Sequence, residues 1–313
     1  MSPAAGQADQ GRPARAGQAD QGRPARADQA DQGQLVLVGT PIGNLGDLSP
    51  RAVSTLAAAA FICCEDTRRT RALLSAAGLP AGTGRLVSLH RHNEAARVDQ
   101  VLDWVVGGRT VAVVSDAGMP GISDPGERLV AGAHARGVPV SVVPGPSAVL
   151  AALVVSGLPT DRFCVEGFLP RKGTDRRRRL SALADESRTA VVLEAPARLA
   201  VTLGDLARAC GDRPVAVARE LTKMHEEVWR GTLQGASEAF AAREVRGEVV
   251  IVVGGAEPGP GPDEDAVRAA VQEHLGRGDG IRQAADAVAA ELGIPRRRAY
   301  TLAIELRDAG GSP

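Results

Sequence analysis

The 313-residue sequence predicts an α/β protein built from two α/β domains and a small helical extension. Short runs rich in Val and Leu alternate with amphipathic stretches, and this alternation passes along the chain twice. A Pro- and Gly-rich segment then separates it from three consecutive helical patterns. Continuous apolar runs are typical of strands that helices cover on both faces, and regular strand–helix alternation favours a mostly parallel sheet.

The first 33 residues are expected to lie outside this fold. Residues 6–16 recur as residues 17–27, and no large aliphatic or aromatic side chain stands between Met1 and Leu35. Such a segment has too few apolar side chains to form a core, so residues 1–33 are predicted to be a disordered repeat tail. The tail also lacks the apolar stretch of a secretory signal and the composition of a transit peptide.

Residues 34–146 are predicted to form the first α/β domain. Ser49 and Pro50 open a helix as N-cap and first residue, and Gly78 and Gly107 end two others. The expected strands are Leu35–Val38, Phe61–Cys64, Leu86–Ser88, Val111–Val114 and Val138–Val143. The expected helices are Pro50–Ala60, Arg69–Ala77, Asn93–Val106 and Pro125–Arg136.

Residues 147–255 are predicted to form the second α/β domain, which begins with the helical segment Ser147–Val155. Its expected strands are Arg162–Phe168, Thr189–Glu194, Val215–Glu220, Glu227–Thr232 and Glu248–Val253. Its other expected helices are Asp175–Ala184, Pro196–Ala209 and Ala236–Arg243.

Residues 256–262 are too rich in Pro and Gly for helix or strand and are predicted to be a linker. The helical extension occupies residues 263–309, with helices expected at Asp263–Leu275, Ile281–Leu292 and Pro295–Arg307. Gly293 separates the last two helices, as in a helix-turn-helix pair.

Composition excludes several classes of protein. The 37 basic and 37 acidic residues balance, so the chain as a whole is no basic nucleic-acid coat. No apolar run approaches the ~18 residues of a membrane span. The four cysteines show neither metal-ligand nor disulfide spacing, which favours a reduced cytoplasm. Aromatic residues make up 2% of the chain, too few for an aromatic platform that stacks RNA bases.

Three loops of small residues follow three of the strands in the first domain. They are Gly39–Asp47, Ser115–Gly126 and Pro144–Ala148. In open α/β sheets, ligands bind at the carboxyl ends of the strands, and glycines let a ligand approach the backbone closely. None of the loops matches the dinucleotide-binding or Walker A pattern. The loops therefore predict a small-molecule site of another kind.

Seven motifs in matching order resemble one known family. They are Gly39–Asp47, Cys64–Arg68, Ser88–Glu94, Ser115–Gly126, Pro144–Ala148, Phe168–Gly173 and Arg219–Glu226. They resemble the bacterial small-subunit ribosomal RNA 2'-O-methyltransferases that act on a cytidine of the decoding region. These enzymes belong to the tetrapyrrole methylase superfamily, the class III methyltransferases. The resemblance spans residues 34–307 and implies S-adenosyl-L-methionine as methyl donor, a donor cleft between the two α/β domains, and a homodimer.

The resemblance also implies which residues bind the donor. They are Pro41, Asp116, Gly118, Met119, Gly121, Ile122, Ser123, Ser147, Ala148, Leu193 and Glu194. After Glu194 the family often has Ser-Pro-His-Arg, whereas this chain has Ala195-Pro196-Ala197-Arg198. At these positions we therefore expect backbone rather than side-chain contacts with the donor.

Two lysines are the leading catalytic or RNA-positioning candidates. Lys172 and Lys223 are the only lysines among the 37 cations. A desolvated lysine can have its pKa lowered until it accepts a proton, whereas arginine cannot. Glu65, Asp66 and Arg68 follow the second strand and are expected to polarise a lysine or orient the ribose. The alternatives are a surface salt bridge for each lysine and an N-cap with an ion pair for the three-residue group.

Arginine is expected to dominate the contact with RNA. The predicted RNA-binding residues are His92, Asn93, Arg171, Arg176, Arg177, Arg178, Arg179, Arg296, Arg297 and Arg298. Clustered arginines suit phosphate and predict salt-sensitive binding, although a solvated charged face would have the same composition. His90 and His92 have the spacing of a metal pair but no evident third ligand, so no metal site is predicted.

The sequence thus predicts a cytoplasmic methyltransferase that transfers a methyl group from S-adenosyl-L-methionine to a ribose 2'-hydroxyl of 16S ribosomal RNA in the small subunit. Two alternatives stay open. One is methylation of a tetrapyrrole or a diphthamide precursor by the same superfamily fold. The other is a metabolite-sensing nucleic-acid binder without catalytic activity.

Overall fold

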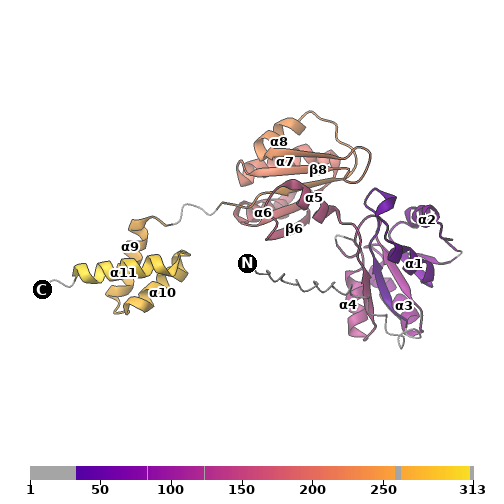
Figure 1. Cartoon of the computed structure of the whole chain (residues 1–313), viewed down its shortest axis with the longest axis horizontal. Helices are drawn as coiled ribbons and strands as arrows, with labels where there is room; N and C mark the ends of the chain where they lie inside the picture. Colours follow the sequence, from indigo (N-terminus) through magenta and orange to yellow (C-terminus); the bar gives the residue numbers. More distant parts are fainter. Residues whose placement is uncertain (1–32, 83, 123, 258–261, 311–313) are drawn as a thin grey trace, which may run out of the picture. The chain divides into compact units, whose positions relative to one another are not determined.

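The computed structural model describes residues 33–82, 84–122, 124–257 and 262–310, and Figure 1 shows its elements in chain order. Most of the predicted repeat tail lies outside these residues. The chain divides into two compact units, of which the second comprises Gly39–Ser49, Ala117–Met119 and everything from Pro144 onward. Among the described residues, no helix has the length and apolar character needed to cross a membrane.

The sheet of the first unit is parallel throughout, as predicted. Its strand order is β3-β2-β4-β1-β5, and Val36 of β1 lies opposite Ala112 of β4 and Ser141 of β5. The strands are β1 (Leu35–Val38), β2 (Phe61–Cys64), β3 (Leu86–Ser88), β4 (Val111–Val114) and β5 (Val140–Val143). Because β4, β1 and β5 are neighbours, the three predicted ligand loops leave adjacent strands of one sheet.

Helices α1 (Pro50–Ala58), α2 (Thr67–Ala76), α3 (Glu94–Val106) and α4 (Glu127–Ala135) connect these strands. Side chains of α3 and α4 share one apolar core with one face of the sheet. Side chains that point the opposite way along the strands are buried too; examples are Val36, Ile62 and Ala112. The uninterrupted apolar runs therefore mark strands covered on both faces.

A carboxylate from another helix caps the start of α4. Gly126 precedes α4 with φ 134° and offers no capping side chain. Glu94, at the first turn of α3, is 5% exposed. Its Oε1 accepts hydrogen bonds from the backbone N–H groups of Gly126 (2.9 Å), Arg128 (3.1 Å) and Leu129 (3.2 Å). This cap satisfies free N–H groups of the helix and fixes the end of the loop that follows β4.

The second unit contains a mixed sheet in the order β6-β7-β10-β8-β9. Only β6 and β7 pair in parallel, and the other neighbours are antiparallel. The strands are β6 (Phe163–Phe168), β7 (Thr189–Glu194), β8 (Pro214–Arg219), β9 (Glu227–Thr232) and β10 (Val249–Val253).

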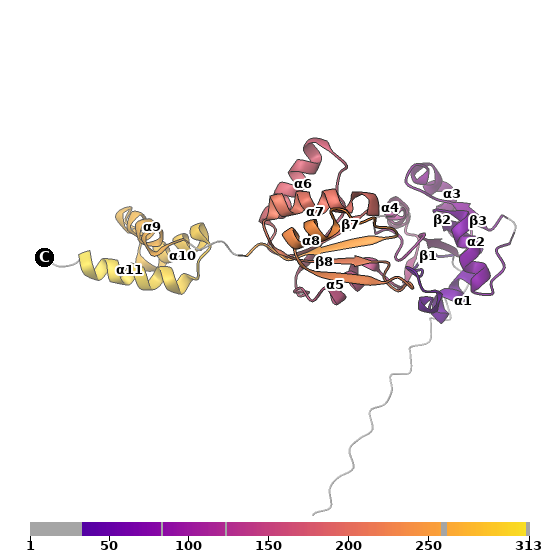
Figure 2. The same ribbon diagram turned by 90° about the horizontal axis from the view of Figure 1, so that it is seen from above.

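Helices cover both faces of this mixed sheet. Helices α6 (Gly173–Asp185), α7 (Leu199–Cys210) and α8 (Leu233–Phe240) pack on one face, and α5 (Ala148–Ser156) packs on the other. Figure 2 shows α6 and α7 on the opposite side of the sheet from α5. Successive residues of β10 alternate between the two cores, so this strand is buried along its whole length.

Helix α8 begins three residues before its predicted start. Thr232 is its N-cap, and the Thr232 hydroxyl accepts a hydrogen bond from the N–H of Gly235 (3.2 Å). This cap directly follows β9, so the chain passes from strand to helix without a loop. The prediction missed the start because Thr232 was assigned to the strand alone.

The C-terminal helices are α9 (Glu264–Gly276), α10 (Ile281–Leu292) and α11 (Arg296–Gly310). They pack on one another around their own apolar core, which includes Val267, Val271, Val288 and Leu302. Gly293 ends α10 in the left-handed conformation with φ 62°. A left-handed glycine at this position is a common helix stop and gives the predicted helix-turn-helix-like pair.

Candidate functional site

The three predicted ligand loops meet through their backbones in the second unit. Thr40 and Gly118 exchange two backbone hydrogen bonds, Thr40 N–H to Gly118 O (2.9 Å) and Gly118 N–H to Thr40 O (3.1 Å). Gly39 and Gly145 touch so closely that a Cβ on Gly39 would lie 2.6 Å from the Gly145 nitrogen. Glycine is required at both positions by this contact. The sequence alone predicted three separate loops, whereas the structure joins them.

The loop after β5 leads directly into α5. Ser147 is the N-cap, and its hydroxyl accepts a hydrogen bond from the N–H of Leu150 (3.4 Å). Helix α5 is apolar throughout, and Leu150 and Val154 are 51% and 73% exposed. An open groove of about 690 Å³ runs along this helix, with Ile42, Pro146, Leu221 and other residues in its walls. The groove is therefore an exposed apolar surface beside the ligand loops.

The turn between β8 and β9 holds the loop that follows β1. Thr222 has φ 66°, a conformation that β-branched residues rarely adopt. Its hydroxyl accepts a hydrogen bond from the Asn44 N–H (3.2 Å), and its own N–H donates to Glu226 Oε2 (2.6 Å). A Cβ on Gly43 would lie 2.3 Å from Cγ of Lys223, so the lysine stem packs directly on this glycine. Backbone strain of this kind is often kept at functional sites.

Lys223 is held by two carboxylates. Its Nζ donates to Glu220 Oε1 (2.8 Å) and Glu248 Oε2 (3.1 Å). Partial burial acts to lower the pKa of Lys223, but the hydrogen bonds to these two carboxylates outweigh it and raise the pKa above its usual value. A proton acceptor needs a lowered pKa, so the structure corrects the assignment of Lys223 as a proton acceptor. Lys223 instead forms salt bridges with Glu220 and Glu248, which was the alternative for this residue.

Lys172 lies in a different setting. It is the N-cap residue of α6, is exposed, and is followed by Gly173 with φ 85°. Among the described residues, no hydrogen bond or ion pair to its ammonium is recorded. Arg171, Arg177, Arg178 and Arg179 are exposed around it on the same loop and helix. Part of this charge is used locally, since Arg178 and Arg179 pair with Asp175 and Glu166.

Arg176 does not belong to this exposed cluster. It is 7% exposed, and its Nε and Nη2 donate to Asp205 Oδ2 at 2.8 and 2.7 Å. Nη1 donates to the Pro170 carbonyl (3.0 Å), and Nη2 also donates to the Thr202 hydroxyl (3.0 Å). The prediction that Arg176 contacts RNA is therefore corrected, because its guanidinium is turned inward and surrounded by acceptors.

Glu194 is also turned inward. It is 2% exposed, and its Oε2 accepts the Thr202 hydroxyl (2.6 Å) and lies 3.2 Å from Nη2 of Arg198. Its Oε1 accepts the N–H of Ala195 (2.8 Å). The carboxylate thus has internal partners on both oxygens, so the predicted contact between the Glu194 side chain and a donor is not supported by this geometry.

Three carboxylates lie near one another at the ends of β2 and β4 in the first unit. Burial, followed by the negative charge of Glu65, raises the pKa of Asp124 to about 6. Burial, followed by the charge of Asp116, raises the pKa of Glu65. Asp116 is compensated, because its Oδ1 accepts the N–H of Asp66 (3.0 Å) and Arg69 approaches Oδ2 at 3.6 Å.

Asp66 and Arg68 adopt the structural alternative that the sequence left open. Asp66 is the N-cap of α2, and its Oδ1 accepts the N–H of Arg68 (2.8 Å). The side-chain hydrogen bond from Arg68 lowers the pKa of Asp66. The Arg68 side chain is 86% exposed and pairs with Asp66.

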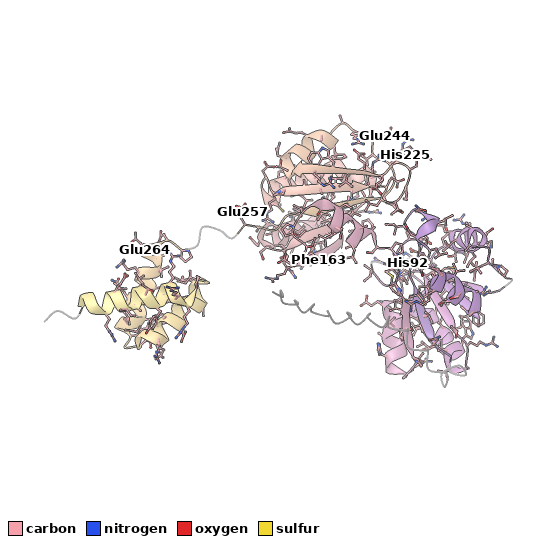
Figure 3. The ribbon with its side chains drawn as sticks, in the orientation of Figure 1. His92, Phe163, His225, Glu244, Glu257 and Glu264 are labelled. Atoms are coloured by element: carbon pink, nitrogen blue, oxygen red, sulfur yellow. The ribbon has the colours of Figure 1, made fainter. Side chains whose placement is uncertain are left out.

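The β3–α3 segment is shaped by Asn93. Its Oδ1 accepts the N–H of His90 (2.8 Å) and its Nδ2 donates to the Ser88 carbonyl (3.1 Å). The amide is used within the loop, which leaves exposed His92 as the better candidate for RNA; Figure 3 labels it. Among the described residues, no group of three His, Cys, Asp or Glu side chains could hold a metal ion.

The remaining predicted residues lie as follows. Pro41, Met119, Gly121 and Ala148 are half-buried, Ile122 is exposed, and Ser123 lies outside the described residues. At the start of α11, Arg296 pairs with Asp286 (Nη2 to Oδ2, 3.3 Å) and lies over the Tyr300 ring. Arg298 donates to the Pro262 carbonyl (3.1 Å). Arg297 is exposed.

Known proteins share both the sequence and the fold. The sequence profile of the tetrapyrrole (corrin/porphyrin) methylases matches residues 34–237. The chain belongs to the tetrapyrrole methylase family. A protein of Mycobacterium tuberculosis named ribosomal RNA small subunit methyltransferase I is 47% identical over 282 residues, 90% of this chain and 98% of that protein. The protein of the same name from Synechocystis is 45% identical over 279 residues, 88% of this chain and 99% of its own length.

Solved structures of the family share the fold. Uroporphyrin-III C-methyltransferase from Thermus thermophilus, complexed with S-adenosyl homocysteine, superimposes with a TM-score of 0.50. It is 24% identical and covers 71% of this chain and 97% of its own. At this identity the likeness shows the fold of the two α/β sheets alone.

Sequence reasoning missed the residues that hold the site in place. Thr202 and Asp205 bind Arg176 from α7, Thr222 binds the Asn44 N–H, and Arg69 pairs with Asp116. The partners in each pair lie too far apart in the sequence for a local pattern to predict the contact. The one available signal was the spacing of Thr202 and Asp205, which puts both on the same face of α7.

We predict a pH-dependent effect of Asp124→Asn on stability. The pKa of Asp124 is raised on folding, so its contribution to stability is fully present below pH ~4 and is lost as the pH rises through about 6. The variant should therefore gain thermal stability relative to the parent as the pH rises from 4 to 7. Melting temperatures across this range measure it. Exposed Asp161→Asn is the control, and a pH-independent difference for Asp124→Asn would contradict the raised pKa.

Proposed function

We propose that this chain transfers a methyl group from S-adenosyl-L-methionine to ribosomal RNA of the small subunit, at a ribose 2'-hydroxyl of a decoding-region cytidine. The supporting observation is the identity of 45% and 47% to ribosomal RNA small subunit methyltransferase I over 88–90% of the chain. The match to the uroporphyrin enzyme is 24% and covers 71%. The ribosomal RNA substrate is therefore favoured over a tetrapyrrole.

The joined loops fit the methyl donor. Gly118 and Gly121 both have φ 85°, a conformation open to glycine but strained for other residues. The donor would lie against Pro41, Gly118, Met119 and the α5 N-cap Ser147. When bound, it supplies an electrophilic methyl group on a positively charged sulfur. A family structure with S-adenosyl homocysteine supports this choice of cofactor.

The remaining tasks fall to the chain's own side chains. The ribose hydroxyl must be held in position, which contributes several kcal/mol to such reactions, and its proton must be accepted. Lys172 is the candidate for this step, because Lys223 is paired with Glu220 and Glu248. Lys172 is exposed in the free chain, so bound RNA would have to remove it from water before it could accept the proton. The half-buried carboxylates Glu65 and Asp124 are the proposed RNA contacts of the first unit.

Exposed arginines are proposed to bind the RNA phosphates. Arg171, Arg177, Arg178 and Arg179 surround Lys172 on one loop and helix, so phosphate binding there would bring RNA to the catalytic candidate. Arg297, with its neighbours Arg296 and Arg298, provides a second basic site on the helical extension. Binding through such clusters should weaken steeply as the salt concentration rises.

The exposed face of α5 supports a homodimer. Leu150 and Val154 of α5 are 51% and 73% exposed, and Leu45 of the neighbouring loop is 56% exposed. Leu150 and Val154 also line the 690 Å³ groove, and exposed apolar surfaces of this kind usually mark interfaces. A second copy of the chain is the proposed occupant.

The function can be tested by incubating the protein and labelled donor with small ribosomal subunits that lack the modification. Mapping of ribose methylation should show label at a single decoding-region cytidine. Label on a tetrapyrrole substrate, with none on the RNA, would favour the alternative of tetrapyrrole methylation. Donor binding without transfer to any small-subunit RNA would overturn the assignment as a ribosomal RNA methyltransferase.

The same assay separates the two lysines. Lys172→Arg should bind donor normally and lose turnover by about 10²-fold, because arginine keeps the charge but cannot accept the proton. Lys223→Arg should keep most of its turnover, since arginine can pair with the same two carboxylates. Full activity of Lys172→Arg would exclude Lys172 as the proton acceptor.

The dimer proposal predicts that Val154→Asp yields a monomer, because a carboxylate in an apolar interface would be buried without a partner. Sedimentation velocity at fixed protein concentration measures this. Val106→Asp, at a similarly exposed apolar residue of α3 (68% exposed), is the control and should remain dimeric. A monomeric parent protein would contradict the proposal.

A further inference from the structure

Two segments with different proposed partners are joined inside the second unit. The end of β7, Leu193–Glu194, is proposed to contact the donor through its backbone. The loop Leu169–Lys172, between β6 and α6, carries the catalytic candidate and begins the arginine cluster. A buried chain of polar groups connects the two segments, and neither the family match nor the named relatives assign it a role.

Thr202 is the central group of this connection. It is completely buried, and its hydroxyl donates to Glu194 Oε2 (2.6 Å) while accepting from Nη2 of Arg176 (3.0 Å). A hydroxyl can donate and accept at once, so it bridges a carboxylate and a guanidinium in a way that an apolar side chain cannot. Hydrogen bonds to charged groups are stronger than those between neutral groups.

Arg176 carries the connection to the loop. Its Nη1 donates to the Pro170 carbonyl (3.0 Å), and Asp205 fixes the same guanidinium at 2.7 and 2.8 Å. Arg198 provides a parallel link, since its Nη2 donates to the Leu169 carbonyl (2.8 Å) and lies 3.2 Å from Glu194 Oε2. Two arginines thus tie the two residues before Arg171 and Lys172 to one carboxylate.

A buried network of this kind is poorly explained by stability alone. Burying charges costs desolvation energy, and replacing such networks by apolar residues is often neutral or stabilising. What a fully bonded network does provide is a fixed arrangement. Here it fixes the carbonyls beside Lys172 relative to the end of β7.

We propose that Thr202 and Arg176 are positioning residues for methyl transfer, which hold the Lys172 loop in register with the donor-binding end of β7. This inference rests on the proposed function, because it takes the roles of both segments from there. This network lies within the second unit. It includes Glu194 and Arg176, which the sequence analysis predicted as donor and RNA contacts. It makes turnover depend on a residue that touches neither substrate.

Thr202→Val tests the proposal, since valine keeps the shape and removes the bridging hydroxyl. We expect kcat to fall about tenfold while the Kd for the donor stays within about twofold. Thr202→Ser, which restores a hydroxyl, should recover kcat. The matched control is Thr189→Val, which removes another buried hydroxyl that donates to the Pro159 carbonyl (2.7 Å) in the same domain. It should lose a similar degree of thermal stability and retain kcat.

Hydrogen exchange gives a readout that does not require activity. In Thr202→Val the amides of Arg171, Lys172 and Gly173 should exchange faster than in the parent, and in Thr189→Val they should not. Unchanged exchange or unchanged kcat in Thr202→Val would overturn the positioning role, as would an equal loss of kcat in Thr189→Val. If the parent protein methylates no small-subunit RNA, the proposed function fails. The exchange rates still decide whether the buried network holds the loop Leu169–Lys172.

Discussion

The contact between the backbones of Gly39 and Gly145 is the constraint on which the candidate site depends. A Cβ on either residue would lie less than 3 Å from backbone atoms of the other. The loops after β1 and β5 can therefore meet only if both positions are glycine. The Thr40–Gly118 pair of hydrogen bonds adds the loop after β4. Because β4, β1 and β5 are neighbours in the parallel sheet, three loops with little side-chain bulk converge. The strained turn at Thr222 and the Lys223 side chain then hold the first of these loops from the other side.

Some charged residues form internal ion pairs, and others stay exposed. The zero net charge includes the buried pair Arg176–Asp205 and the pairs of Lys223 with Glu220 and Glu248. The exposed cations that are proposed to bind phosphate lie around Lys172 and at the start of α11. A phosphate can be bound by the exposed groups only, so residue counts in a basic run overstate the binding surface. Arg176 stands among five exposed cations in the sequence and is nevertheless part of the interior.

Local pattern was sufficient for the fold. The strands Leu35–Val38, Phe61–Cys64 and Val111–Val114 have their predicted bounds because each is an uninterrupted apolar run between small or polar residues. Helix ends were less certain where a cap doubled as a strand residue, as at Thr232. The candidate site could be predicted only in part. Its loops could be found from their glycines, but the pKa of Lys223 depends on Glu248, which is 25 residues away in the sequence. Burial of Arg176 and Glu194 likewise arises from tertiary packing that no spacing in the sequence reports.

The most direct test of this account is the donor affinity of Gly145→Ala, measured by titration calorimetry. The added methyl group would lie 2.8 Å from the backbone of Gly39, so the loops must separate, and we expect the Kd for S-adenosyl-L-methionine to rise at least about tenfold with an unchanged circular dichroism spectrum. Gly276→Ala is the control, because its Cβ would meet nothing within 4 Å. Donor affinity equal to that of the parent in Gly145→Ala would contradict the claim that this backbone contact builds the donor site.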